Sequence, residues 1–79
     1  MDAEQIRGLI QASLPDAQVR VAGDDGVHFE ALVVSPAFVG LKPLQRHRLV
    51  YAALGDLMGG AIHALALRTE TPDEHAGHA

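Results

Sequence analysis

The sequence contains no cysteine, and in a chain of 79 residues this absence limits how a fold can be held together. A chain this short buries only about 60% of the surface that its unfolded form exposes, so small domains often depend on a disulfide or a structural metal. Without cysteine, the chain alone can form neither a disulfide nor a thiolate metal site. Hydrophobic residues make up 48% of the chain, but aromatic residues only 4%. We therefore expect a single globular domain over residues 1–79 with a thin, aliphatic core.

The first helix is predicted over residues 2–14 from the spacing of four aliphatic side chains, which are Ile6, Leu9, Ile10 and Leu14. Asp2 followed three residues later by Gln5 is typical of a capping box at a helix start, and Pro15 would end the helix. An isolated helix of this length is marginal in water, whereas each large aliphatic side chain that is buried contributes about 1.5–3 kcal/mol. The helix therefore requires a sheet against which it can pack.

Alternating apolar residues predict that sheet. Residues 18–22 and 27–35 flank a Gly-Asp-Asp-Gly turn and are typical of an antiparallel hairpin. Residues 62–69 alternate as a third strand, which would run parallel to the second because helical segments connect the two. In the second strand, one face carries Val27, Phe29, Ala31 and Val33, and the other carries His28, Glu30, Leu32 and Val34. We expect the first of these faces to lie against the core.

Proline and glycine delimit the remaining helical segments. Ser35 followed by Pro36 predicts a helix start, but Gly40 would end that segment after a single turn. A longer helix is predicted over residues 43–58, between a proline and a Gly-Gly pair. Its inward side chains are expected to be Leu44, Val50, Tyr51, Leu54, Leu57 and Met58. A Thr-Pro pair at 71–72 predicts one more helix start. The predicted order is αββααβα, a KH-like α+β fold whose three-stranded mixed sheet has its helices on one face.

The charge pattern narrows the function classes. The formal net charge is −4 with histidine neutral, which argues against a general polyanion-binding protein, because phosphate neutralisation requires a basic face. A local basic patch is nevertheless predicted on the helix over 43–58 and its start, at Lys42, Arg46, His47 and Arg48. Such a patch is either a contact surface for a partner or nucleic acid, or the solvated side of an amphipathic helix. Arg46 and Arg48 are expected on the more solvated sides of this helix.

Other classes find no support in the sequence. KH-type RNA binding is not expected, because the turn at residues 40–43 lacks the second glycine of a Gly-x-x-Gly loop. No Ser-His-Asp set, carboxylate pair or phosphate loop is apparent, so we do not expect an enzyme. The first residues do not read as a signal peptide, and no apolar run reaches the roughly 18 residues of a membrane span. We therefore expect a cytoplasmic protein without a membrane partner.

Three segments, in this order, resemble the BolA family. A His-Phe pair at 28–29 leads into Ala-Leu-Val-Val-Ser at 31–35. Residues 38–51 read Phe-Val-Gly-Leu-Lys-Pro-Leu-Gln-Arg-His-Arg-Leu-Val-Tyr, and residues 62–67 read Ile-His-Ala-Leu-Ala-Leu. The resemblance covers nearly the whole chain. Most members of the family have a longer loop between the first two strands, with a histidine or cysteine that serves as a cluster ligand. The four residues at 23–26 are instead similar to the short-loop IbaG branch.

The resemblance implies that His63 is a ligand of a two-iron two-sulfur cluster, because neutral imidazole can replace thiolate on one iron. The pattern alone would favour a histidine satisfied by a backbone partner. His28 is the best candidate for a second ligand, because parallel neighbouring strands lie about 4.8 Å apart and both histidines lie near the starting ends of such strands. Alternation places the two on opposite faces, so strand twist would have to bring them together. Asp24 and Asp25 remain alternatives, and His28 could also be an ordinary surface histidine.

The resemblance also implies a non-catalytic adaptor in iron-sulfur cluster trafficking and iron homeostasis. Its partner would be a monothiol glutaredoxin of the Cys-Gly-Phe-Ser type, whose cysteine and bound glutathione hold the rest of a shared cluster. The alternative is a DNA-binding transcriptional regulator of the BolA type, in which the two middle helices contact DNA. A structural interaction module is a third reading. Alone, the chain is expected to be a monomer or a weak homodimer.

Overall fold

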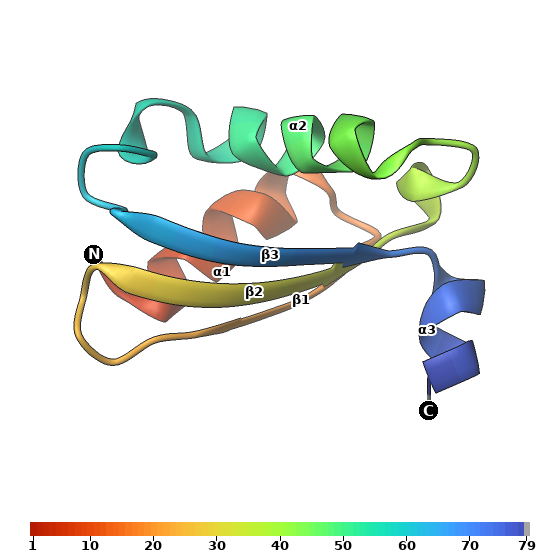
Figure 1. The fold of residues 1–79 in the computed structure, drawn as a ribbon, viewed down its shortest axis with the longest axis horizontal. Coiled ribbons are helices and arrows are strands. Elements are labelled where there is room, and N and C mark those ends of the chain that lie inside the picture. Colours follow the sequence, from red (N-terminus) through yellow and green to blue (C-terminus); the bar gives the residue numbers. More distant parts are fainter. Residues whose placement is uncertain (79) are drawn as a thin grey trace.

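The structure, a computed structural model, describes residues 1–78. Its elements in chain order are α1 (Ala3–Ser13), β1 (Gln18–Ala22), β2 (His28–Val34), the 3-10 turn η1 (Pro36–Phe38), α2 (Pro43–Leu54), the 3-10 turn η2 (Gly55–Leu57), β3 (Ala64–Glu70) and α3 (Pro72–His78). Figure 1 shows α1 and α2 over one face of the sheet, with α3 projecting from the end of β3 on the other side. The αββααβα order is confirmed, with η1 as its second helical segment.

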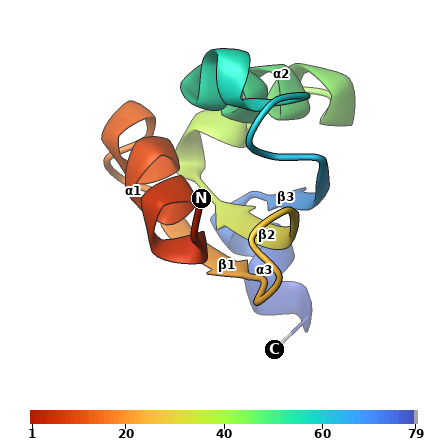
Figure 2. The same ribbon diagram turned by 90° about the vertical axis from the view of Figure 1, so that its left-hand side faces the viewer.

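The sheet is mixed, as predicted, with the strand order β1-β2-β3. The hairpin pairs β1 with β2 antiparallel, and Val19 lies opposite Val33. The pairing of β2 with β3 is parallel, and Phe29 lies opposite Leu65. The view in Figure 2, turned by 90°, shows α1 and α2 side by side above the three strands. Most of the opposite face of the sheet is therefore left without a helical layer.

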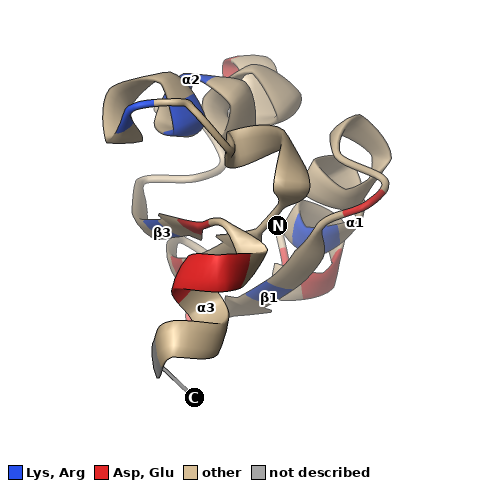
Figure 3. Cartoon of the chain, turned by 90° about the vertical axis from the view of Figure 1, so that its right-hand side faces the viewer, with Lys and Arg blue, Asp and Glu red and all other residues tan. Residues whose placement is uncertain are grey.

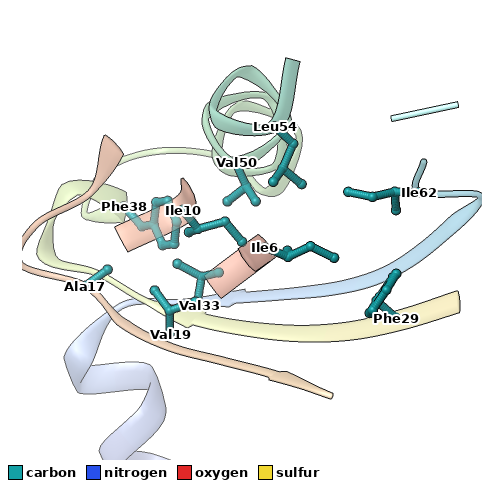
Figure 4. Close-up of a cluster of buried hydrophobic side chains, with 10 residues drawn as sticks. All are labelled: Ile6, Ile10, Ala17, Val19, Phe29, Val33, Phe38, Val50, Leu54 and Ile62. Atoms are coloured by element: carbon teal, nitrogen blue, oxygen red, sulfur yellow. The ribbon is translucent and has the colours of Figure 1, made fainter. Parts of the chain in front are cut away.

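The core lies between this sheet and the two long helices, and it is almost entirely aliphatic (Figure 4). It comprises Ile6, Ile10, Ala17, Val19, Phe29, Val33, Phe38, Val50, Leu54 and Ile62. In β2 the side chains of Phe29, Ala31 and Val33 are buried while His28 and Glu30 are exposed. The predicted inward face is therefore confirmed for these three residues, whereas Val27, its fourth predicted member, precedes the strand and is half-buried. Val34, expected on the outer face, is also buried, at the end of the sheet where α3 follows β3.

The long helix α2 ends earlier than predicted. It stops at Leu54 rather than at residue 58, because Gly55 adopts φ +55° and the chain continues as the 3-10 turn η2. Two of the expected inward residues, Leu44 and Tyr51, are 62% and 38% exposed. At about 100° per residue, they lie about 120° and 100° around the helix from Val50, whereas Leu54 lies only about 40° away. The buried face of α2 is therefore narrower than the predicted one.

Smaller differences occur at the ends of other elements. Leu9, expected on the inner face of α1, is 38% exposed because it lies about 100° around the helix from the buried Ile10. The third strand begins at Ala64, two residues later than predicted. The capping box of α1 is confirmed, since the Asp2 carboxylate accepts from the amide of Gln5 at 2.8 Å and the Gln5 side chain accepts from the amide of Asp2 at 2.9 Å. No helix within the described residues has the length and apolar character that crossing a membrane requires.

Candidate functional site

The candidate ligand residues gather at the end of the sheet formed by the β1–β2 turn and the start of β3. The turn packs tightly against the first residues of β2, since a Cβ at Gly23 would lie 2.6 Å from the carbonyl oxygen of His28. A glycine is therefore required at this position. In register, His28 lies opposite Ala64, the residue after His63. Both histidine backbones thus lie within one residue of the same rung of the sheet.

The ring of His28 is held by Asp25, a residue of the turn. One carboxylate oxygen of Asp25, Oδ1, accepts from the amides of Val27 at 2.9 Å and of His28 at 2.8 Å. The other, Oδ2, lies 2.6 Å from Nδ1 of the His28 ring. These contacts, of which the His28 amide is the strongest, hold the pKa of the Asp25 carboxyl well below its usual range. The side chain of His28 nevertheless remains 65% exposed.

His63 belongs to the connection before β3 and not to the strand itself. Its amide donates to the carbonyl oxygen of Val27 at 3.0 Å, and this bond ties the connection to the start of β2. On the other side the amide of Ile62 donates to the carbonyl oxygen of Leu57 at 2.9 Å. The residue is exposed, and its ring has no hydrogen-bond partner within the part of the chain that the structure describes. Because His63 precedes β3, strand alternation does not determine the side to which its ring points.

A shallow hollow on the open face of the sheet lies beside His28. The turn contributes Asp24 and Asp25 to it, and β3 contributes the small side chains Ala64 and Ala66. Among the described residues, no three histidine or carboxylate side chains converge as a metal-binding group. The structure therefore brings the predicted ligand residues His28 and His63 to one end of the sheet, and it places Asp25 behind His28.

The predicted basic patch is divided by the fold. The Arg46 guanidinium bonds Glu74 at 2.6 Å, donates to the carbonyl oxygen of Leu41 at 2.9 Å and lies over the Phe38 ring at 6.0 Å. Its side chain is only 11% exposed, so the expectation that Arg46 lies on a solvated side of the helix is wrong. Arg46 instead connects α2 with the acidic start of α3; Figure 3 colours basic residues blue and acidic ones red.

The other members of the patch differ in exposure. His47 is half-buried and its ring packs edge-on against Tyr51, with centroids 6.2 Å apart. Lys42 and Arg48 are exposed. The cationic part of the patch that reaches solvent is therefore formed by Lys42 and Arg48.

Two contacts at and near the site were not predicted. The Asp25–His28 contact is local, because the two residues are three positions apart. Asp in a turn commonly bonds nearby backbone amides, so this contact could have been predicted from the sequence. The Arg46–Glu74 pair spans 28 positions and has no local signal.

Comparison with known proteins places the chain beside one family. The family model described as BolA-like protein matches residues 9–74. BolA-like protein 1 of Homo sapiens is 60% identical over 45 residues, which cover 57% of this chain and 33% of that protein. The chain thus spans about a third of the length of this curated relative.

A relative from Vibrio cholerae, named DNA-binding transcriptional regulator BolA, is 51% identical over 47 residues, or 60% of this chain and 44% of that protein. Among solved structures, a BolA protein homologue from Coxiella burnetii is 47% identical and superposes with a TM-score of 0.84. That similarity covers 96% of this chain and 97% of the other.

Proposed function

The chain belongs to the BolA-like protein family, and we propose on this basis that it is a non-catalytic adaptor that shares or transfers a two-iron two-sulfur cluster with a monothiol glutaredoxin. One observation carries the proposal. The parallel register of β2 and β3 holds two exposed histidines, His28 and His63, within one residue of the same rung at one end of the sheet. In some two-iron two-sulfur centres two imidazoles replace the two thiolates of one iron, so a pair of histidines matches the number of ligands required.

The cluster is cargo in this proposal, and the chain supplies only part of its ligands. Because the sequence has no cysteine, the thiolates must come from the partner. A Cys-Gly-Phe-Ser glutaredoxin would supply its cysteine and a bound glutathione to the second iron. The adaptor then alters how firmly the cluster is held and where it is delivered, without turning over a substrate. The exchange requires a reducing compartment such as the cytoplasm, where thiols persist.

Mixing the chain with a cluster-loaded monothiol glutaredoxin tests the proposal. We expect the visible absorption and circular dichroism to change on mixing, because replacing thiolate by imidazole alters the electronic environment of the iron. His63→Ala should abolish the new spectrum, and His28→Ala should weaken it. His75→Ala is the matched control, since His75 lies on α3 beside Glu70, and it should leave the spectrum as in the wild type. An unchanged spectrum on mixing with the wild-type chain would contradict the adaptor function.

DNA binding is the second candidate, and the name of the Vibrio cholerae relative favours it. The net charge of −4 and the engagement of Arg46 with Glu74 weigh against it, since Lys42 and Arg48 are the cations of the patch that remain exposed. A regulator that uses both cations would retard a DNA fragment, and its affinity would fall steeply as the salt concentration rises. The double variant Lys42→Ala with Arg48→Ala should then reduce the slope of log K against log salt concentration by about 2, because two phosphate contacts are lost. An adaptor would show neither effect.

A further inference from the structure

The contacts of Asp25 extend the proposed function, on which the following inference rests. We infer that Asp25 is a positioning residue that holds the His28 ring with its proton on Nδ1, so that Nε2 is the atom presented to the iron of the shared cluster. His28 would then act as the ligand, with Asp25 in the layer behind it. The inference removes Asp25 from the alternatives for a direct ligand.

The hydrogen bonds determine which ring nitrogen carries the proton. An ionised carboxylate accepts hydrogen bonds and donates none, so the Nδ1 atom that lies 2.6 Å from Asp25 Oδ2 must carry hydrogen. A neutral imidazole has one protonated nitrogen, and the other offers a lone pair. Nε2 is therefore the free donor atom of His28. Metal ligation requires this neutral form with a lone pair directed outward.

The carboxylate is itself held in place and does not follow the ring. Its other oxygen, Oδ1, accepts from the amides of both Val27 and His28. These two bonds attach the carboxylate to the backbone of the residue that it orients. A histidine whose second nitrogen donates to a fixed carboxylate is the arrangement that supports histidine ligands in metal sites, where it sets the tautomer and the ring direction.

The surroundings of His28 leave Nε2 accessible. The side chain is 65% exposed, and the hollow beside it is lined by the small side chains of Ala64 and Ala66. By contrast, the Asp25 carboxylate already accepts from two backbone amides and lies against the His28 ring, so three of its roughly four lone pairs are engaged. Asp25 is therefore better suited to orient a ligand than to be one.

Asp25→Asn separates this role from a purely structural one. The amide oxygen of asparagine can still accept from the two backbone amides, so the turn is preserved. Its NH2 group would then face Nδ1 and donate to it, which requires the opposite tautomer with hydrogen on Nε2. The substitution thus reverses the tautomer without removing the turn. Glu30→Gln is the matched control, because it removes an equal charge from an exposed residue that lines the same hollow.

The first measurement uses the free chain and no cluster. Long-range proton–nitrogen NMR at pH about 8, where an ordinary histidine is neutral, reports which ring nitrogen carries hydrogen. We expect Nδ1–H for His28 in the wild type and in Glu30→Gln, and Nε2–H in Asp25→Asn. The inference is overturned if the wild-type ring carries its proton on Nε2, or if Asp25→Asn leaves the tautomer unchanged.

The second measurement uses the mixture with cluster-loaded glutaredoxin. Asp25→Asn should shorten the lifetime of the mixed cluster about 10- to 100-fold, as is typical when the support of a ligand histidine is removed. In a chain that already carries His28→Ala, Asp25→Asn should cause no further decrease in the lifetime of the mixed cluster. If the wild type forms the mixed cluster but His28→Ala does not affect it, the adaptor function is supported, whereas the role of Asp25 in positioning a ligand is contradicted. If the wild type forms none, the proposed function fails, and the ligand-positioning role fails with it whatever the tautomer.

Discussion

Gly23 lies where the β1–β2 turn presses against the start of β2. A Cβ at this position would lie 2.6 Å from the carbonyl oxygen of His28 and 2.6 Å from Cδ1 of Phe29, so the turn would have to move. We expect Gly23→Ala to lower the free energy of unfolding by about 1–3 kcal/mol, the usual cost of overpacking. Gly8→Ala is the control with the opposite sign. A Cβ there meets nothing within 4 Å, and alanine in a helix interior stabilises by about 0.5–1 kcal/mol. Urea titration of both variants measures the difference, and equal effects would contradict the prediction.

At the residue scale, the sequence predicted burial well where one local period decided it. Phe29 and Val33 were assigned correctly because strand alternation allows only two faces. Leu44 and Arg46 were assigned incorrectly, because a helix presents a continuous range of directions and the exposed fraction depends on what packs against it. The exposure of Arg46 was decided by Glu74 and Phe38, which lie in other elements. No pattern within the helix contains that information.

The link between α2 and α3 depends on the charge of one carboxylate. Glu74 accepts from the amide of Thr71 at 2.7 Å and from Arg46 at 2.6 Å, and these contacts, the Thr71 amide first, lower its pKa from 4.5. A lowered pKa in the folded state stabilises the fold above the unfolded value, and this contribution is lost as pH falls through the folded value. We therefore expect the urea midpoint of the wild type to fall between pH 6 and pH 3 more steeply than that of Glu74→Gln.

Asp73→Asn serves as the control for this experiment. Asp73 is exposed in the same helical turn, and its side chain makes no hydrogen bond or ion pair to another described residue. The variant should keep the steep acid loss of the wild type. Equal slopes for the wild type and Glu74→Gln would mean that the carboxylate of Glu74 does not hold α3 to α2 in solution.

At the element scale, the order of helices and strands was predictable because each element carries its own period and its own proline or glycine boundary. The end of α2 was not. Leu57 and Met58 continue the apolar spacing of the helix, but Gly55 turns the backbone into η2 at that point. Both residues still pack against the core from this turn. At these two positions the apolar pattern therefore predicted the packing against the core correctly but predicted the end of the helix wrongly.

At the scale of the whole molecule, the topology was predictable from the sequence, and the topology determines where the candidate site residues lie. Helical segments between β2 and β3 require a parallel pairing, and this pairing places His28 and His63 at one end of the sheet. The fold does not contain the rest of the proposed cluster site, because the thiolates would belong to another protein. The hydrophobic pattern of one chain predicts the helices and strands of that chain, but it does not predict which protein would supply the thiolates. The contact between Asp25 and the His28 ring could likewise not be predicted from the hydrophobic pattern, since it is a polar contact within a turn.

The integrity of this site should depend on the core as a whole, and Leu54 tests that dependence. Leu54 ends α2 and is 3% exposed, in the buried cluster that also contains Ile62, the residue before His63 (Figure 4). Leu54→Ala leaves a cavity that should cost about 2–5 kcal/mol, a large share of the roughly 5–15 kcal/mol that stabilises a small domain. Leu44→Ala, in the same helix but 62% exposed, should cost less than about 0.5 kcal/mol.

Urea titration followed both by far-ultraviolet circular dichroism and by the His63 NMR signal measures the two variants. Because the connection before β3 is bonded to η2 on one side and to Val27, the residue before β2, on the other, His63 should lose its native signal at the same midpoint as the helices. A cost below about 1 kcal/mol for Leu54→Ala would mean that the buried face of α2 is assigned wrongly. An earlier transition at His63 would mean that this end of the sheet opens by itself, and His63 would then be held less rigidly than the register of β2 and β3 implies.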